Sequence, residues 1–353
     1  MNLENKKIRV LVVDDSIFMQ KILSDILNAD SRIEVIDTAK DGLEAIVKAR
    51  DLTPDVITLD IHMPDLDGKD ALKRIMSKYP TAVVLVSAYT QENAPVTLEC
   101  LALGAVDFVA KPSGEVSTDM ATMGSVLIEK VVMASKVDVK KNLSSSQNQD
   151  IDQSLFKNTT SGKKIVVIGA STGGPGVIEN IISQLTPPLN LPVVIAQHMP
   201  AMFTKSFAER LNKTSKIPVK EASLGEEVLA NQIYIAPGNF NVLFEINNVG
   251  KTVFKFQEGS DDKITLTPSV DELFTSAADK YGSNILGIIL TGMGMDGVKG
   301  TAKIKEKGGK IIVQDESSSL IYGMPREIVK NGHADEILSP EGIAKAINIF
   351  GHL

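Results

Sequence analysis

The chain has 353 residues, of which 43% are hydrophobic, and its formal net charge is -7. This length suits two domains, and the composition excludes a chain that is disordered throughout. A single cysteine, Cys100, excludes a disulfide framework and indicates a reduced compartment. Residues 1–7 contain no apolar signal segment, and no apolar run approaches the roughly 18 residues that span a bilayer. We therefore expect a cytoplasmic protein without direct membrane insertion.

Acidic residues are concentrated in the first part of the chain. Residues 1–140 carry 16 Lys and Arg against 22 Asp and Glu, whereas residues 163–353 carry 19 against 20. Neither part has the basic stripe with which proteins neutralise the phosphates of nucleic acids. The charge distribution therefore argues against a nucleic-acid partner.

Short β-rich runs alternate with amphipathic helical segments in the first 140 residues. Five such repeats predict a parallel sheet that is covered by helices on both faces. The predicted strands are 8–13, 33–37, 56–60, 82–87 and 106–109.

Polar side chains follow these strands at their carboxyl ends. Asp14 and Asp15 follow the first strand, Asp60 ends the third, Ser87 ends the fourth, and Lys111 follows the fifth. Ligands of open parallel sheets bind beyond the carboxyl ends of the strands, so we expect these groups to converge. Three carboxylates favour a hard divalent cation such as Mg²⁺, with Lys111 placed to pair with an anion added to Asp60. The alternative is a helix-capping Asp pair among scattered surface acids.

Residues 1–140 resemble the receiver domain of two-component response regulators. The resemblance rests on these strand ends and on Leu59-Asp60-Ile61-His62-Met63-Pro64-Asp65-Leu66-Asp67-Gly68. It implies a flavodoxin-like fold and phosphorylation of Asp60 by a chemotaxis histidine kinase. It also implies that Mg²⁺ is held by Asp14, Asp15, Asp60 and the backbone carbonyl of His62.

The same resemblance assigns a conformational switch to Ser87 and Phe108, with Lys111 pointed inward by a cis peptide before Pro112. His62 stands where close relatives often have a glutamate. We expect its side chain to be exposed and not to bind the metal.

Polar residues dominate between Asn142 and Gly162, where the apolar periodicity stops. Such a segment buries too little apolar surface to offset the entropy of ordering it. We expect residues 141–162 to be a linker between a domain of residues 1–140 and a domain of residues 163–353, with Phe156 among the few side chains able to dock.

The second part of the chain again alternates strands and helices, which predicts a doubly wound, mostly parallel α/β sheet. An antiparallel hairpin is expected within 241–266, around the turn Asn247-Asn248-Val249-Gly250. The predicted strands of the sheet are 164–168, 192–197, 232–235, 285–290 and 310–313.

Three of these strands are followed by residues that together suit nucleophilic catalysis. Ser171 lies in Gly169-Ala170-Ser171-Thr172-Gly173-Gly174, which matches the G-x-S-x-G nucleophile elbow; His198 and Asp296 follow two other strands. An imidazole takes the serine proton, and a carboxylate orients the imidazole. Taken singly, Ser171 suits a helix cap or phosphate loop, Asp296 a helix cap and His198 a polar loop. Their expected meeting at one sheet edge favours catalysis.

The chain order of Ser171, His198 and Asp296 is not the serine, acid, histidine order of α/β-hydrolases. Residues 163–330 resemble instead the catalytic domain of chemotaxis protein-glutamate methylesterases, a family with an N-terminal receiver. Besides the serine segment, the motifs are Gln197-His198-Met199-Pro200, Tyr234-Ile235-Ala236-Pro237-Gly238, Pro268-Ser269-Val270-Asp271, Leu290-Thr291-Gly292-Met293-Gly294-Met295-Asp296-Gly297 and Tyr322-Gly323-Met324-Pro325-Arg326.

This resemblance implies that Ser171 attacks methylated glutamates on the cytoplasmic helices of chemoreceptors, releasing methanol, and allows deamidation of receptor glutamines. The amides of Thr172 and Met293 are the candidate oxyanion donors, and no cofactor is expected in the esterase site. The receiver is expected to hinder receptor access until Asp60 is phosphorylated. Where members commonly carry a histidine after Ala-Pro-Gly, this chain has Asn239-Phe240-Asn241.

Two other functions fit the sequence less well than an esterase. A receiver coupled to a DNA-binding output is disfavoured by the nearly balanced charge after residue 162 and by the lack of a helix-turn-helix pattern. A nucleotide-binding glycine loop is disfavoured because the segment lacks the Gly-Lys-Ser/Thr ending of a P-loop and has Pro175 after its glycines.

Overall fold

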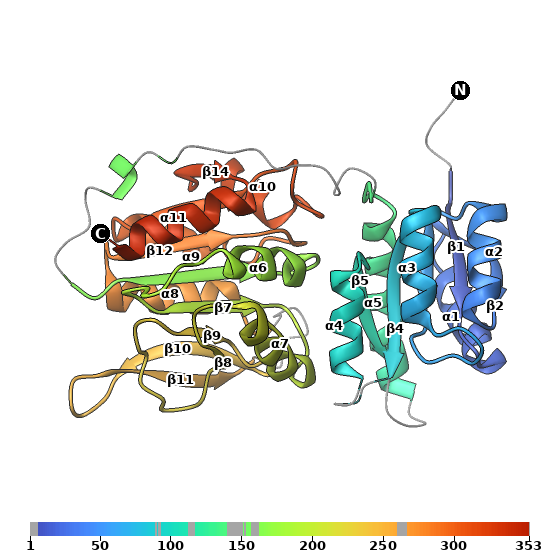
Figure 1. The fold of residues 1–353 in the computed structure, drawn as a ribbon, viewed down its shortest axis with the longest axis horizontal. Helices are drawn as coiled ribbons and strands as arrows, with labels where there is room; N and C mark the ends of the chain where they lie inside the picture. Colours follow the sequence, from blue (N-terminus) through green and yellow to red (C-terminus); the bar gives the residue numbers. More distant parts are fainter. Residues whose placement is uncertain are drawn as a thin grey trace. The chain divides into compact units, whose positions relative to one another are not determined.

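The computed structural model describes residues 6–88, 90, 93–111, 117–139, 151, 153–156, 162–259 and 267–352. The chain divides into two compact units, Met1–Leu143 and Ser144–Leu353. In Figure 1 the first unit runs from blue to green and the second from green to red. Each unit builds a sheet of its own.

The first unit is a five-stranded parallel sheet with the strand order β2-β1-β3-β4-β5, which confirms the predicted flavodoxin-like fold. Register pairs Val13 with Leu59 and Leu59 with Leu85, so β1, β3 and β4 end near one another. The strands are β1 (Ile8–Val13), β2 (Ile33–Ala39), β3 (Val56–Leu59), β4 (Ala82–Ala88) and β5 (Asp107–Lys111).

Helices cover both faces of this sheet. On one face α2 contacts α3 and α3 contacts α4, and on the other α1 contacts α5. Three of the helices begin at a capping side chain: Ser16 for α1, Asp41 for α2 and Asp67 for α3. The helices are α1 (Ile17–Asn28), α2 (Gly42–Leu52), α3 (Gly68–Lys78), α4 (Ala94–Ala102) and α5 (Ser117–Ala134).

The second unit contains a seven-stranded sheet with the order β14-β13-β12-β6-β7-β9-β8, and every neighbouring pair is parallel. Strands β6 (Ile165–Ala170), β7 (Val193–Gln197), β9 (Ile233–Ile235), β12 (Ile285–Ile289) and β13 (Lys310–Gln314) match the predicted ones. The edge strands β8 (Val219–Glu221) and β14 (Glu336–Leu338) were not predicted. Both contain charged residues and so lack the unbroken apolar run that marks the equally short β9.

The expected hairpin forms a separate antiparallel sheet of β10 (Phe240–Ile246) and β11 (Thr252–Glu258); the end of the range predicted for it lies outside the described residues. It packs on α8 (Val270–Tyr281), where the ring of Phe244 meets Tyr281 edge-on at 5.8 Å. The amide of Phe244 also donates to Ser276 Oγ at 2.8 Å. The hairpin therefore supports the helix whose first turn reaches the candidate site.

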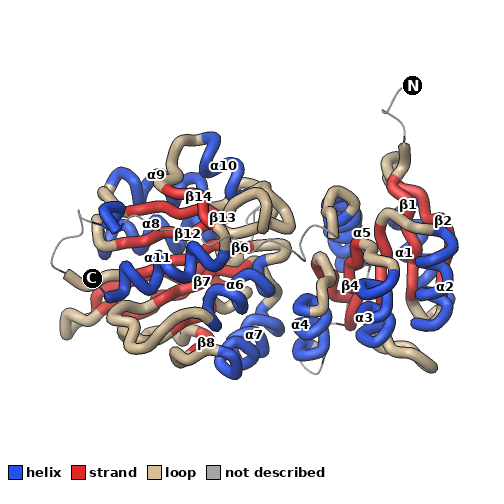
Figure 2. The backbone as a smooth tube through the Cα atoms, turned by 45° about the horizontal axis from the view of Figure 1, so that its top comes forward, coloured by secondary structure: helices blue, strands red, loops and turns tan. Residues whose placement is uncertain are grey.

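Helices also cover both faces of the seven-stranded sheet. Helix α6 (Gly174–Ser183) contacts α7 (Ala201–Thr214) and α11 (Pro340–His352), and these three lie in front of the sheet in Figure 2. On the other face α8 contacts α9 (Val298–Glu306), which contacts α10 (Met324–Lys330). Strands β6, β7 and β12 are buried along their whole length, as expected of strands covered on both faces.

The short 3-10 helix η3 (Gln153–Phe156) belongs to this unit. Phe156 is 2% exposed and its ring lies 5.2 Å from that of Phe350 in α11. Part of the segment expected to be a linker is thus held against the second unit. Within the described residues, no helix is both long and apolar enough to cross a bilayer.

Candidate functional site

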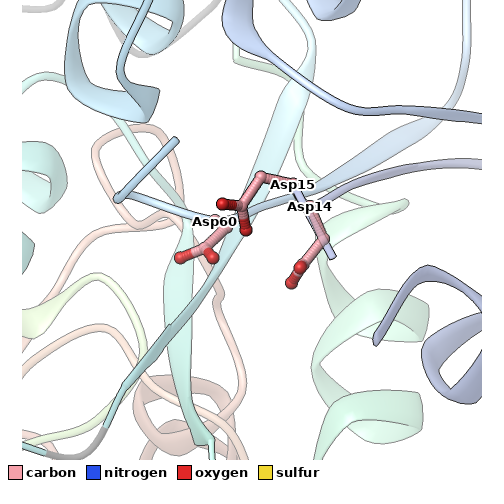
Figure 3. Close-up of side chains that lie close together, drawn as sticks. All are labelled: Asp14, Asp15 and Asp60. Carbon is pink, nitrogen blue, oxygen red and sulfur yellow. The ribbon is translucent and has the colours of Figure 1, made fainter. Parts of the chain in front are cut away.

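The structure brings together the three carboxylates among the predicted metal ligands of the first unit. Asp14 and Asp15 follow β1 and Asp60 follows β3, and one carboxylate oxygen of each lies within 4.8 Å of the others. Figure 3 shows the three side chains gathered at these strand ends. Asp14 and Asp60 are buried, whereas Asp15 is exposed. A buried pair with one solvent-facing carboxylate can hold a hard cation that keeps part of its water.

Lys111 pairs with two of these carboxylates. Its Nζ lies 2.6 Å from Asp14 Oδ2 and 2.6 Å from Asp60 Oδ2. Burial raises the pKa of Asp14 even though Lys111 lowers it. Burial also acts to lower the pKa of Lys111, but the charges of Asp60 and Asp14 outweigh it and raise this pKa. Three carboxylates and one ammonium group do not balance in charge, so the cluster can accept a further positive charge.

The two predicted switch residues, Ser87 and Phe108, lie in the neighbouring strands β4 and β5. The hydroxyl of Ser87 is fully buried and has no hydrogen-bond partner in the described part of the chain. Phe108 is 5% exposed, and Lys130 Nζ lies 5.4 Å from the centre of its ring. His62 is exposed, as expected, and its Nε2 lies 2.6 Å from Asn93 Oδ1. The Lys111–Pro112 peptide lies outside the described residues.

In the second unit, Ser171 and His198 follow directly on paired residues of neighbouring strands. The register of β6 and β7 pairs Ala170 with Gln197, and the amide of His198 donates to the Ala170 carbonyl at 2.9 Å. On the other side of β6, the amide of Ser171 donates to the carbonyl of Thr291, just beyond β12, at 3.1 Å. The loops that carry His198 and Asp296 therefore approach Ser171 from its two sides.

His198 and Asp296 form a direct contact. Nε2 of His198 lies 2.8 Å from Oδ2 of Asp296, and the side chains are only 6% and 18% exposed. The other ring nitrogen, Nδ1, is buried and has no hydrogen-bond partner among the described residues. An ionised carboxylate only accepts, so the imidazole proton lies on Nε2 and Nδ1 is left as a base.

The first turn of α8 holds the carboxylate of Asp296. Val270 donates its amide to Oδ2 at 2.8 Å, and Asp271 donates its amide to Oδ1 at 2.9 Å. Burial acts to raise the pKa of Asp296, but the hydrogen bond and attraction of His198 and these two amides lower it below its ordinary value. His198 first, and the amides of the helix N-terminus after it, therefore favour the ionised form of Asp296.

The turn that carries Ser171 is fixed by buried polar groups. The carbonyl of Ser171 accepts from Gly174 N at 2.8 Å and from Gln197 Nε2 at 2.9 Å. Gly173 has a φ of 79°, which favours glycine. A Cβ on Gly292 would lie 2.7 Å from the Cβ of Ser171, so only glycine lets the neighbouring loop approach the serine this closely.

Thr291 joins the loops around the serine. Its Oγ1 donates toward the carbonyls of Thr172 at 3.1 Å and Ile321 at 3.2 Å, and it accepts the amide of Ile321 at 2.9 Å. The two predicted oxyanion donors lie in these loops, since Thr172 follows Ser171 and Met293 follows Gly292. The structure places both next to the serine segment, and their role stays a prediction.

Sequence reasoning did not single out four polar residues that shape this site. Gln197 and Thr291 had a signal, because each is a polar residue at the end of an apolar strand and lies within one of the family motifs. Asn241 had none: its Oδ1 accepts the amide of Ser269 at 2.8 Å across 28 residues of chain. Ser269 in turn caps α8 and lies 3.3 Å from Asp296 Oδ1. Asn241 thus supports the carboxylate of Asp296 indirectly, through Ser269.

Together, fold and geometry define a protein with a receiver unit and an α/β unit that carries a serine, histidine and aspartate site at its sheet edge. Two family models match the chain: the response regulator receiver domain over residues 10–119 and the CheB methylesterase over residues 166–347. The chain belongs to the CheB methylesterase family and is a methylesterase with an N-terminal receiver domain. The predicted family is confirmed.

Similar proteins cover nearly the whole chain. The protein-glutamate methylesterase/protein-glutamine glutaminase of Thermotoga maritima is 46% identical over 95% of this chain and 96% of its own. The protein of the same name from Bacillus licheniformis is 42% identical over 97% and 98%. The crystal structure of the Thermotoga maritima CheB methylesterase catalytic domain matches with a TM-score of 0.51 at 43% identity, covering 53% of this chain and 98% of that structure.

Proposed function

We propose that this enzyme removes methyl esters from glutamate side chains of chemoreceptors, with Ser171 as nucleophile, His198 as base and Asp296 as the group that orients the base. The contact between His198 Nε2 and Asp296 Oδ2, with Nδ1 left buried and unpaired in the described structure, carries the proposal. It leaves one basic nitrogen on a residue that directly follows β7, the strand paired with the one that Ser171 follows. The names of the similar proteins supply the substrate class.

The reaction has two halves. Ser171 Oγ attacks the ester carbonyl carbon while His198 Nδ1 takes its proton, and Asp296 stabilises the imidazolium that forms. His198 then returns the proton to the methoxy group, which leaves as methanol. Water attacks the acyl-enzyme with His198 again as base, so that the glutamate carboxylate and free Ser171 are restored. A glutamine side chain reaches the same acyl intermediate by loss of ammonia, which accounts for deamidation by the same site.

The tetrahedral intermediates carry a negative oxygen that needs hydrogen-bond donors. We assign this role to the backbone amides of Thr172 and Met293, in the two loops next to Ser171. The amide of Ser171 is committed to the Thr291 carbonyl and is not a candidate. Losing one such donor costs about 2.7–4 kcal/mol of transition-state stabilisation.

The receiver, residues 1–140, is proposed to regulate the catalytic domain of residues 163–353 through the segment 141–162. Asp60 accepts a phosphoryl group from a chemotaxis histidine kinase, and Lys111, Ser87 and Phe108 respond to it. The residues present fit Mg²⁺, since Asp14, Asp15 and Asp60 offer clustered hard oxygens, joined in this proposal by the backbone carbonyl of His62. When bound, the cation neutralises charge around the phosphorylated carboxylate.

Methanol release from methylated receptor, with and without a small-molecule phospho-donor, tests both parts of the proposal. We expect release by the wild-type enzyme, a higher rate with the donor, and covalent labelling of Ser171 by a serine-directed phosphonate. Wild-type rates in a well-folded Ser171→Ala variant would contradict the assigned nucleophile.

A further inference from the structure

Asp296 caps helix α8, which contains Asp271, and Asp271 caps helix α9, which Asp296 precedes. Asp296, just before α9, accepts the amides of Val270 and Asp271 at the start of α8. In return, Asp271 accepts two amides from the start of α9: Gly297 N at 3.0 Å and Gly300 N at 2.7 Å, both on its Oδ1. The carboxylate that accepts amides at the start of each helix thus comes from outside that helix.

Helix α9 depends on this carboxylate for its cap. Its N-cap residue is Gly297, with a φ of 102°, and no side chain at that position bonds to the helix. Ser, Thr, Asp or Asn normally supplies that bond locally. Here the acceptor comes from Asp271, 26 residues earlier. Helix α8, by contrast, has its own cap in Ser269.

The helices also approach one another too closely to shift freely. A Cβ on Gly300 would lie 2.5 Å from Phe274 Cβ and 3.1 Å from the carbonyl oxygen of Asp271. Gly297 follows Asp296 directly, so a bond to Gly297 N restrains the residue next to the catalytic carboxylate. A displacement of about 1 Å in a positioned catalytic group can cost on the order of 100-fold in rate.

We propose that Asp271 is a positioning residue of the esterase site: by accepting the amides of Gly297 and Gly300, it holds Asp296 against Nε2 of His198. This inference rests on the proposed function, because it assigns the supporting contact of the proposed catalytic Asp296. Asp271 itself touches neither His198 nor Ser171 through any contact that the described structure contains.

The role depends on the oxygen Oδ1 and not on the negative charge. Burial raises the pKa of Asp271, the amides of Gly300 and Gly297 lower it, and the charge of Asp296 raises it further. An asparagine keeps Oδ1 as an acceptor for both amides and carries no charge to desolvate. Asparagine is therefore expected to replace Asp271 with little loss, whereas alanine removes the cap.

Asp335 is the matched control in the same domain. Its carboxylate also accepts a backbone amide, from Ile311 at 2.8 Å, and it pairs with Lys305 at 2.6 Å. Ile311 lies near the amino end of β13, whereas Ser171 and His198 follow the carboxyl ends of their strands. Removing Asp335 therefore tests the general effect of losing a carboxylate that accepts a backbone amide.

The experiment compares methanol release by full-length wild-type enzyme with that by the Asp271→Ala, Asp271→Asn and Asp335→Ala variants. We expect Asp271→Ala to lower kcat by at least about tenfold with KM changed less than about twofold, because substrate contacts are intact. Asp271→Asn should stay within about threefold of wild type, and Asp335→Ala within about twofold even if its Tm falls. If Asp271→Ala does not fold, Asp271→Ser takes its place, since its shorter side chain cannot reach both amides.

A folded Asp271→Ala or Asp271→Ser variant with wild-type kcat would overturn the inference. So would an Asp271→Asn variant as slow as Asp271→Ala, or an equal loss of kcat in Asp335→Ala. The proposed function fails separately, through a wild-type enzyme that releases no methanol or an active Ser171→Ala variant.

Discussion

His198 faces Asp296 through Nε2, at 2.8 Å, while its Nδ1 stays buried without a partner in the described structure. In the serine protease arrangement the carboxylate binds Nδ1 and the serine faces Nε2. In this enzyme the two ring nitrogens of His198 therefore exchange roles relative to that arrangement. Either ring nitrogen can act as the base when a carboxylate holds the proton on the other, so the same proton transfer is available through Nδ1.

Ser171 and His198 should act as one unit. We expect Ser171→Ala to abolish turnover and His198→Ala to be nearly as damaging, because either change stops proton transfer from the nucleophile. The double variant should be no slower than the worse single variant, as in other catalytic triads. Methanol release by the three variants, each checked for folding by circular dichroism, measures this. Multiplying losses in the double variant would show that the two residues act independently.

Asp296 should make the stability of the catalytic domain depend on pH. Its pKa is lowered from 3.8, so its stabilising contacts are fully present above that value and are lost as pH falls below it through the folded-state pKa. Asp296→Asn should lower the unfolding free energy by about 1–3 kcal/mol at neutral pH. This gap to wild type should shrink on acidification below pH 3.8. Denaturant titrations of the fragment from residue 163 across this range test the prediction, which a constant gap would contradict.

Thr291 should be required for the shape of the nucleophile turn. Valine has a similar shape but lacks the hydroxyl that serves Thr172 and both backbone groups of Ile321. Leaving buried backbone groups unpaired costs about 1–3 kcal/mol, so Thr291→Val should lower Tm and reduce kcat. Thr291→Ser keeps the hydroxyl and is the control. A Thr291→Ser variant as slow as Thr291→Val would contradict the prediction, because serine keeps the hydroxyl that makes these hydrogen bonds.

Mg²⁺ should stabilise the receiver. A ligand that binds only the folded state raises the midpoint of unfolding in a concentration-dependent way. Thermal unfolding of residues 1–140 in increasing MgCl₂ measures the effect. We expect the Asp15→Ala/Asp60→Ala variant to lose it and the control Asp25→Ala, at an exposed position of α1, to keep it. An unchanged response of the double variant would place the cation elsewhere.

Phosphorylation should relieve inhibition by the receiver. Deleting residues 1–140 should raise basal methanol release, and Asp60→Ala should keep the full-length enzyme slow with any phospho-donor. A tenfold gain in the active population needs only about 1.4 kcal/mol of differential stability. A fragment from residue 163 that is slower than the unphosphorylated full-length enzyme would mean that the receiver contributes positively to catalysis or docking.

The sequence by itself determined which strands are followed by side chains that can react or bind a ligand. Asp14, Asp60, Ser171 and His198 each follow an apolar run, and parallel pairing gathers the carboxyl ends of such runs at one edge whatever the details of packing. Local pattern was therefore sufficient for both sheets and for the residues at their edges. It was insufficient for β8 and β14, which have no unbroken apolar run and are recognised as strands through their pairing with a neighbouring strand.

Only the tertiary structure decided how the site residues face one another. The ring orientation of His198 follows from a carboxylate 98 residues away, and the cap of α9 from Asp271, 26 residues before Gly297. Asn241 reaches Ser269 across 28 residues. Hydrogen bonds of this kind leave no periodic trace in the chain, since they depend on how two helices and a hairpin pack and not on the spacing of residues within any one of them.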